Sequence, residues 1–522
     1  MKMHLQDEFI YQIFVPSFYD ADGDGIGDLL GVREKLSYLA SLGVKYLSLS
    51  QIFETTNKSA PYAVTDLSAL DPAVGSLADL EDLFREAHAL DIRVILVLPI
   101  YAVSDAHVWF FKACAAQSGY NLFKDYFLWR KGGGSSGKRP PKKSGLDPEN
   151  AEYRYCEAIN EWYLADGGSP LLNMENPRAR REITDIIAFW KEKGADGFAL
   201  SGLSLALKKQ ENVDLHKATE ESFDVGKGCY MLLREIKEKS ILGENDTLLL
   251  ERTTIDAYTA KYILKEASLV NVIGASPLRE NESNEKGKFR ISSFLSQYKD
   301  TMTEEIASTC LNVFEDEMHH RLLRGIPSEA RDMAAKALCM LLFTAPSVPF
   351  LYYGQEIGMT GQDAKNINTE STPFQWDNKT NAGFTSSRFP WTAVNDNYSR
   401  INLAAEIQNE ESVLRFYRKM IEFRKSSEIL RKGAFIPCLG KEKDVIAFIR
   451  RYEGGEFFVI CSLSAKEINY SVPMELLGSG ATVAFSNYSI VSNTLHSTIG
   501  LRPFEARIYA PKSEGKEIVL RP

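Results

Sequence analysis

Short, uninterrupted apolar runs alternate with helical patterns through the first hundred residues, and this alternation constrains the fold more than any other feature. We predict strands over residues 11–18, 45–50 and 93–100, and helices over residues 31–42 and 77–90. Strands that are apolar throughout are typical of parallel sheets covered on both faces. Repeated strand–helix units of this kind predict either a doubly wound sheet or a barrel.

The strand–helix rhythm stops after residue 103 and resumes at Arg178. Between these points the chain is irregular and rich in Gly, Pro and Lys, and its basic Gly/Ser loop, residues 131–143, is interpreted as a solvated linker rather than an anion site. From residue 432 short β-strand patterns follow one another, which predicts an all-β region. We therefore expect four segments: a first part of the main domain (1–103), an insertion domain (104–176), a second part of the main domain (177–431) and a C-terminal β domain (432–522).

The composition is that of an ordinary globular protein, with 44% hydrophobic and 25% charged residues. A net charge of −9 argues against general nucleic-acid binding, which needs a basic surface. We see neither a signal peptide nor an apolar run long enough to cross a membrane. The seven cysteines are scattered and form no CxxC pair, which favours reduced thiols in the cytoplasm.

Six longer motifs carry a family resemblance over nearly the whole chain. They occupy residues 11–28, 125–130, 349–359, 372–377, 381–384 and 395–398, the last followed by Asn402. Together they resemble glycoside hydrolase family 13, the α-amylase superfamily, and within it the oligo-1,6-glucosidase and α-glucosidase branch. The resemblance implies a (β/α)8 TIM barrel with an insertion domain after strand 3, a C-terminal β-sandwich domain, and a catalytic face at the C-terminal ends of the barrel strands.

The resemblance also locates the position of the catalytic nucleophile, and that position holds a different residue here. In the family an aspartate ends a Gly-Phe-Arg-x-Asp motif, and the corresponding residues of this chain are Ala199 in place of the arginine and Ser201 in place of the aspartate. An unactivated serine hydroxyl is a poor nucleophile, and no His or Lys in the motif could deprotonate it.

Apolar residues occupy further positions at which the family carries polar groups. The third-strand Asp-x-x-x-Asn-His motif has become Val97, Tyr101 and Ala102 at its three polar positions, and the aspartate of a Gly-Tyr-Asp motif has become Ala63. The tyrosine of that motif is kept as Tyr62, which either packs or still offers a sugar platform. We expect a less polar pocket that is filled or reshaped.

Two acids persist at family positions. Glu251 matches the general acid, and Asp316 aligns with the last conserved carboxylate, next to Glu315. We interpret Glu251 and Asp316 as remnants, because an acid without its nucleophile has no retaining mechanism to serve. The alternative is an altered, inverting hydrolysis by Glu251 together with Asp316 or Glu315, which requires two of these carboxyl groups to lie about 6.5–9.5 Å apart.

A loop of alternating acids follows the first predicted strand. Asp20, Asp22, Asp24 and Asp28 are interleaved with glycines, and clustered carboxylates of this kind suit a hard cation such as Ca²⁺. The loop resembles the calcium loop of the oligo-1,6-glucosidase branch. The resemblance implies that these four side chains and the Ile26 carbonyl hold a structural Ca²⁺.

Our leading hypothesis is a cytoplasmic pseudoenzyme of carbohydrate metabolism, an α-glucosidase relative with absent or strongly impaired catalysis. It would bind an α-glucoside or gluco-oligosaccharide, or partner an active paralogue, without nucleic acid or membrane. Two alternatives stay open: an active α-glucoside hydrolase with an altered mechanism, and a non-catalytic scaffold or partner protein.

Overall fold

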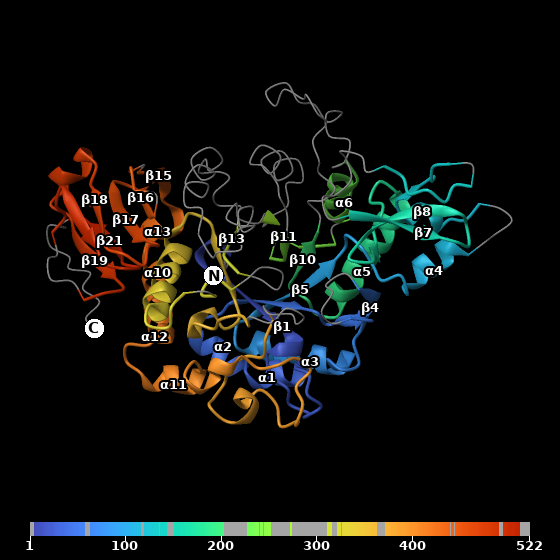
Figure 1. Cartoon of the computed structure of the whole chain (residues 1–522), viewed down its shortest axis with the longest axis horizontal. Helices are drawn as coiled ribbons and strands as arrows, with labels where there is room; N and C mark the ends of the chain where they lie inside the picture. Colours follow the sequence, from blue (N-terminus) through green and yellow to red (C-terminus); the bar gives the residue numbers. More distant parts are fainter. Residues whose placement is uncertain are drawn as a thin grey trace, which may run out of the picture.

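The protein is described by a computed structural model, shown in Figure 1. The described residues are 5–57, 63–115, 120–134, 136–142, 151–202, 227–239, 241–243, 245–251, 272–273, 311–315, 321–324, 326–362, 371–438, 440–442, 444–489 and 494–511.

Eight parallel strands form the central sheet, in the order β12-β11-β10-β5-β2-β1-β14-β13. Every neighbour in this order is also the next of these strands along the chain, except that the first, β1, pairs with the last, β14. A doubly wound sheet lacks such a first-to-last pairing, whereas a (β/α)8 barrel requires it. The barrel prediction is therefore confirmed. The strands are β1 (Ile10–Phe14), β2 (Tyr46–Ser50), β5 (Arg93–Pro99), β10 (Gly197–Ser201), β11 (Thr247–Glu251), β12 (Val272–Ile273), β13 (Leu311–Val313) and β14 (Val348–Tyr352).

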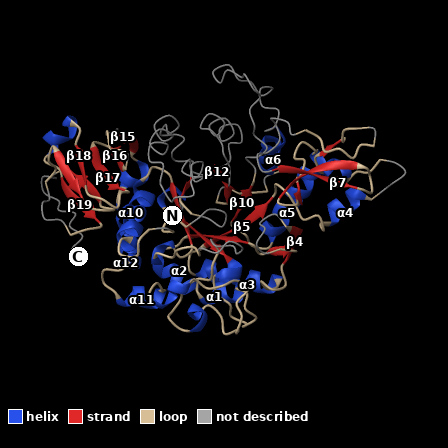
Figure 2. Ribbon diagram, in the orientation of Figure 1, coloured by secondary structure: helices blue, strands red, loops and turns tan. Residues whose placement is uncertain are grey.

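Helices cover the outer face of the curled sheet (Figure 2). Local signals fix their starts: Ser76 and Asp79 form a capping box on α3 (Leu77–Ala89), and Asn176 caps α5. The apolar faces of these helices join the main core. The remaining longer helices are α1 (Leu29–Glu34), α2 (Leu36–Leu42), α5 (Pro177–Glu192), α6 (Lys227–Glu238), α10 (Arg331–Thr344), α11 (Leu403–Gln408), α12 (Val413–Ser426) and α13 (Glu428–Lys432).

Two predicted elements differ from the observed ones. The strand predicted over residues 11–18 ends at Phe14 and continues as a 3-10 turn, because Pro16 has no amide hydrogen for the sheet. The helix predicted over residues 31–42 is two helices that meet at Lys35, and Gly43 ends the second one with a positive φ of 91°.

The barrel interior has its own apolar cluster, separate from the core between sheet and helices. The inward-facing side chains come from alternate strand positions, as in other barrels. They are Ile10, Tyr46, Ile95, Val97, Ala199, Leu249, Val313, Val348 and Phe350, and Leu5 of the 3-10 turn Leu5–Asp7 joins the same cluster.

The chain between β5 and α5 carries a second, antiparallel sheet at one end of the molecule (Figure 1). Part of the basic loop folds back on itself there, because Gly133 and Arg139 exchange two backbone hydrogen bonds, and most of its described residues are exposed. The elements of this segment are α4 (Val108–Cys114), β6 (Trp129–Arg130), β7 (Ala151–Cys156), β8 (Glu161–Asp166) and β9 (Ser169–Pro170).

The all-β region lies at the opposite end of the molecule (Figure 1). A five-stranded antiparallel sheet, β15-β16-β17-β21-β19, and the pair β18-β20 share one apolar cluster. No helix in the described part of the chain combines the length and the apolar character that crossing a lipid bilayer requires. The strands are β15 (Ala434–Pro437), β16 (Val445–Tyr452), β17 (Gly455–Ser462), β18 (Ile468–Ser471), β19 (Thr482–Ser486), β20 (Thr498–Leu501) and β21 (Ala506–Ala510), and a small hairpin elsewhere pairs β3 (Phe53–Thr55) with β4 (Val64–Leu70).

Candidate functional site

The C-terminal ends of β10 and β11 bring two of the predicted site residues together. The parallel register pairs Ser201 with Glu251, and each is the last residue of its strand. Both are buried, with 1% of Ser201 and 5% of Glu251 exposed. Gln12 of β1 donates a hydrogen bond through Nε2 to Glu251 Oε1 at 3.4 Å. Glu251 thus has a serine, not a second acid, as its register partner on β10.

Within the described residues, the Ser201 hydroxyl forms no hydrogen bond, and Gln12 Oε1 accepts none. A buried hydroxyl without a partner is costly, and such groups occur where water or a ligand completes the site. No histidine or lysine among the described residues forms a hydrogen bond with Ser201, so none is placed to deprotonate it.

Below these strand ends the barrel interior is apolar. Ala199 pairs in register with Val97 on one side and with Leu249 on the other, and all three belong to the interior cluster. Ala63 is buried as well. Three of the described positions at which the family resemblance implies charged groups, Val97, Ala199 and Ala63, therefore hold buried apolar side chains.

The insertion segment covers the end of β5. Ala102 forms an isolated antiparallel bridge with Leu171, and both pack with Tyr101 and Leu164 in a separate buried cluster. These contacts fill the space next to the two former polar positions of the third-strand motif, Tyr101 and Ala102.

Glu315, just beyond β13, is held by a cation. Arg321 Nη1 lies 3.2 Å from Glu315 Oε2, and the Leu322 amide donates to Glu315 Oε1 at 2.8 Å. The guanidinium lies over the rings of Tyr352 and Tyr353, with 4.6 and 4.9 Å to the ring centroids. Glu315 is thus a paired, buried carboxylate. Sequence reasoning missed Arg321, and it missed Gln12, whose polar side chain in an otherwise apolar strand was a usable signal.

Two of the predicted site residues, Tyr62 and Asp316, lie outside the described residues.

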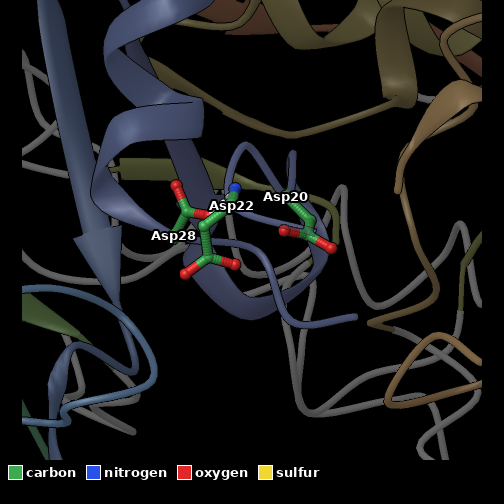
Figure 3. A group of neighbouring side chains, drawn as sticks. All are labelled: Asp20, Asp22 and Asp28. Carbon is green, nitrogen blue, oxygen red and sulfur yellow. Dashed lines mark hydrogen bonds between the residues drawn. The ribbon is translucent and has the colours of Figure 1, made fainter. Parts of the chain in front are cut away.

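The acidic loop brings three of its four aspartates together (Figure 3). Carboxylate oxygens of Asp20, Asp22 and Asp28 lie within 4.8 Å of one another. Asp24 is exposed and outside this group, and its Oδ1 accepts from the amide of Ile26, which is partly buried. The loop geometry therefore brings together three of the four aspartates that the resemblance implies as ligands.

Backbone amides orient these carboxylates. Asp20 accepts from Gly23 and Gly25 at 2.7 and 2.8 Å, and Thr385 donates its hydroxyl to the same side chain. Asp28 accepts from Gly31 at 2.6 Å and so also caps α1. These bonds fix the oxygens in place before any ion binds.

Electrostatics at the loop favour a cation. Burial raises the pKa of Asp28, backbone hydrogen bonds oppose this, and the charge of Asp22 raises it further. No Lys or Arg forms an ion pair with Asp20, Asp22 or Asp28 in the described part of the chain. Clustered oxygen ligands that lack a cationic side chain fit a hard divalent ion.

The family model for the catalytic domain of α-amylase matches residues 12–433, which is most of the chain. The protein belongs to the α-amylase family.

Curated members of the α-amylase family match this chain over most of its length. An oligo-1,6-glucosidase of Bacillus cereus is 28% identical and covers 98% of this chain and 100% of its own length. The trehalose-6-phosphate hydrolase of Bacillus subtilis is 26% identical, with 96% and 97% covered. The mouse amino acid transporter heavy chain SLC3A1 is 28% identical, with 85% of this chain and 68% of its own covered.

Solved structures support the same α-amylase family fold. The isomaltulose synthase of Erwinia rhapontici has a TM-score of 0.83 at 24% identity and covers 98% of this chain and 99% of its own. The trehalose-6-phosphate hydrolase of Bacillus licheniformis has a TM-score of 0.82 at 23% identity, with 97% and 99% covered. At this identity the likeness shows the fold alone.

Proposed function

We propose that this α-amylase family member recognises an α-glucoside without cleaving it by the family's two-carboxylate route. One observation carries the proposal: the residue in register with Glu251 on the neighbouring strand is Ser201. Retaining hydrolysis needs two carboxyl groups about 5–5.5 Å apart, one to attack the anomeric carbon and one to protonate the leaving oxygen.

The surroundings support impaired catalysis. Val97 and Ala199 are packed in the apolar interior, so neither position offers a charged group to the reacting sugar or to a catalytic carboxylate. Loss of one such electrostatic group typically costs about 3–4 kcal/mol of transition-state stabilisation. Glu315, the other described acid that an altered mechanism could use, is bound to Arg321, which counts against its service as a base.

The ligand class rests on the relatives. Two relatives are named for the glucosides that they hydrolyse, as oligo-1,6-glucosidase and trehalose-6-phosphate hydrolase. We therefore propose an α-glucoside or gluco-oligosaccharide as the ligand. The described cysteines are free thiols, which supports a cytoplasmic location.

The decisive experiment combines an activity assay with a binding measurement. Wild-type protein and Glu251→Gln are incubated with maltose, isomaltose and an aryl α-glucoside, and the same sugars are titrated calorimetrically. We expect saturable heat without turnover, and no difference in hydrolysis between the two proteins. Turnover comparable to an active oligo-1,6-glucosidase, abolished by Glu251→Gln, would contradict the proposal.

A second candidate function is a non-catalytic partner protein. One relative supports it, because a protein 28% identical to this chain is named as the heavy chain of an amino acid transporter. Absence of both turnover and heat in the experiment above would favour this candidate, with an active paralogue as the partner to test.

We also propose that Asp20, Asp22 and Asp28 hold a structural Ca²⁺. Asp24 and the Ile26 carbonyl would complete the ligand set that the resemblance implies. The support is the three-carboxylate cluster. The ion would neutralise the loop and fix it against Phe384 and Thr385, which already form hydrogen bonds with Asp20.

A further inference from the structure

A cavity of about 540 Å³ lies outside the barrel, beside the acidic loop. Its walls come from that loop, the first turns of α1 and α3, the end of β4 with the loop that follows it, and the last turn of α5. Figure 1 shows α1 and α3 side by side. None of the described lining residues belongs to a barrel strand, so the cavity is separate from the site of Ser201 and Glu251. A volume of this size is typical of sites for small molecules.

Hydrogen bonds join the elements around the cavity and fix its walls. The Leu29 amide donates to the Val74 carbonyl at 2.8 Å, which ties the end of the acidic loop to the loop before α3. The buried Trp190 indole donates through Nε1 to the Leu67 carbonyl at 2.8 Å, which ties α5 to β4. A cavity with walls fixed in this way binds a ligand without the loss of freedom that ordering a loop would cost.

Three carboxylates line the cavity: Asp22 and Asp28 of the acidic loop, which lie next to each other in Figure 3, and Asp79 in the first turn of α3. Asp79 Oδ2 accepts from the Ser76 hydroxyl at 2.6 Å and from the Ser76 amide at 2.9 Å, and these bonds lower the pKa of Asp79. No Lys, Arg or His is among the described lining residues, and no Lys or Arg of the described chain forms an ion pair with these three aspartates. The wall is therefore negatively charged and lacks a balancing cation from those residues.

The rest of the described lining is mostly apolar. Leu30, Leu77 and Phe189 face the cavity and are only partly buried. An inorganic cation would leave these side chains in contact with water, whereas an uncharged apolar molecule would desolvate the carboxylates without pairing them. Acids on two separate elements, combined with an apolar lining, favour a ligand in which hydrocarbon segments join several ammonium groups.

We propose that this cavity binds an aliphatic polyamine. One ammonium group pairs with Asp22 and Asp28, another pairs with Asp79, and the methylene segments cover the apolar lining. The site shares no residue with the barrel mouth, so it does not depend on the proposed recognition of an α-glucoside. A Ca²⁺ ion in the acidic loop would compete for Asp22 and Asp28, and binding is therefore measured without added divalent cations.

The test titrates the full-length protein with spermidine in an isothermal calorimeter at pH 7 and low ionic strength. We expect saturable heat from a single site, with an affinity that falls as salt is added, because charge pairing contributes to binding. The comparison ligand is 1,8-octanediol, which has a similar chain length and no charge, and it should give no saturable heat. Equal binding of the diol would overturn the role given to the carboxylates.

Variants locate the site. Asp22→Asn and Asp79→Asn each remove one charge and should weaken spermidine binding about tenfold or more. Ser68→Lys adds an ammonium group to the cavity wall at an exposed residue and should abolish binding, whereas Asp396→Asn removes an exposed aspartate that does not line the cavity and should change nothing. The proposal is overturned if the wild-type protein gives no saturable heat, or if Ser68→Lys binds spermidine as tightly as Asp396→Asn does. Ser68→Lys leaves the acidic loop and the capping box intact, so it decides the question even where an aspartate variant fails to fold.

Discussion

Arg321 and Glu315 form an ion pair in which both side chains are almost completely buried, at 0% and 3% exposure, with 3.2 Å between Nη1 and Oε2. The same guanidinium nitrogen donates to the Tyr353 carbonyl at 2.7 Å, so the pair links the segment after β13 to the end of β14. Two charges at this depth are tolerated because each compensates the other.

The first prediction concerns the loss of this compensation. Arg321→Met leaves the Glu315 carboxylate buried without its cation, and we expect a loss of about 3–5 kcal/mol in the free energy of unfolding, measured by urea denaturation. The double variant Arg321→Met with Glu315→Gln should recover part of that loss. The control is Arg234→Met in an exposed pair with Glu238, which should change stability by less than about 1 kcal/mol. If Arg321→Met and Arg234→Met lowered the free energy of unfolding equally, the buried pair would have no special role.

The second prediction concerns the acidic loop. If Ca²⁺ binds there, a hundredfold excess over its dissociation constant stabilises the folded protein by about 2.7 kcal/mol, and a chelator removes this gain. Asp20→Asn should abolish most of the Ca²⁺-dependent rise in melting temperature, because Asp20 belongs to the carboxylate cluster. Asp396→Asn is the control, since Asp396 is an exposed aspartate that lies outside the acidic loop. A melting temperature that is insensitive to Ca²⁺ in the wild-type protein would rule out the proposed ion.

The fold followed from the sequence where local signals agreed with the global pattern. The apolar run at 93–100 became β5, and the helix predicted over 77–90 became α3, whose Ser76–Asp79 capping box is a local feature. Boundaries failed where one residue overrode a longer pattern: Pro16 shortened the first strand, and the chain breaks at Lys35. Periodicity averages over several residues, so it cannot show a single break.

The site was predictable only in part, because contacts between distant residues depend on topology. The aspartate cluster could be expected from alternation within nine residues, although the alternation also included Asp24, which lies outside the group of three. The Gln12–Glu251 hydrogen bond joins two strands that no local pattern relates. Ser201 was assigned by family resemblance, and the register with Glu251 then gave it a definite neighbour.

The third prediction is an acid-sensitive contact in the C-terminal β region. Burial by itself raises the pKa of Glu505, but hydrogen bonds from Arg502 and Arg507, both 2.8 Å from Oε1, outweigh it and lower the pKa to about 2. An unfolded glutamate has a pKa of about 4.3, so the ionised form is favoured by folding. Ionised Glu505 therefore contributes about 3 kcal/mol to the free energy of unfolding. This contribution is fully present above pH 4.3 and is lost as the pH falls toward 2.

Hydrogen exchange in β21 measures this contribution, because Glu505 immediately precedes that strand. At pH 7 Glu505→Gln should speed exchange of the β21 amides relative to the wild-type protein, and the two proteins should converge as the pH falls toward 2. Glu475→Gln is the control, as Glu475 is an exposed acid in the same region. Equal protection in Glu505→Gln and wild type at pH 7 would show that the two arginines do not stabilise the fold through this carboxylate.

The last prediction tests the environment of Ser201, the residue that the resemblance aligns with the family's nucleophile. Ser201→Asp places a carboxylate at a site with 1% exposure, beside Glu251 and above an apolar interior. Burial and the neighbouring acid both raise the pKa of the new aspartate above its unfolded value of about 3.9. The folded state therefore binds its proton more tightly than the unfolded state, and the destabilisation, more than about 2 kcal/mol at pH 7, should shrink as the pH falls through the folded pKa toward 3.9. Ser201→Asn has nearly the same shape without a charge, so the difference in unfolding free energy between the two variants, measured at pH 4 and pH 7, isolates the charge. If the difference in unfolding free energy between the two variants were the same at both pH values, residue 201 would be hydrated. The buried site on which the proposed loss of hydrolysis rests would then be wrong.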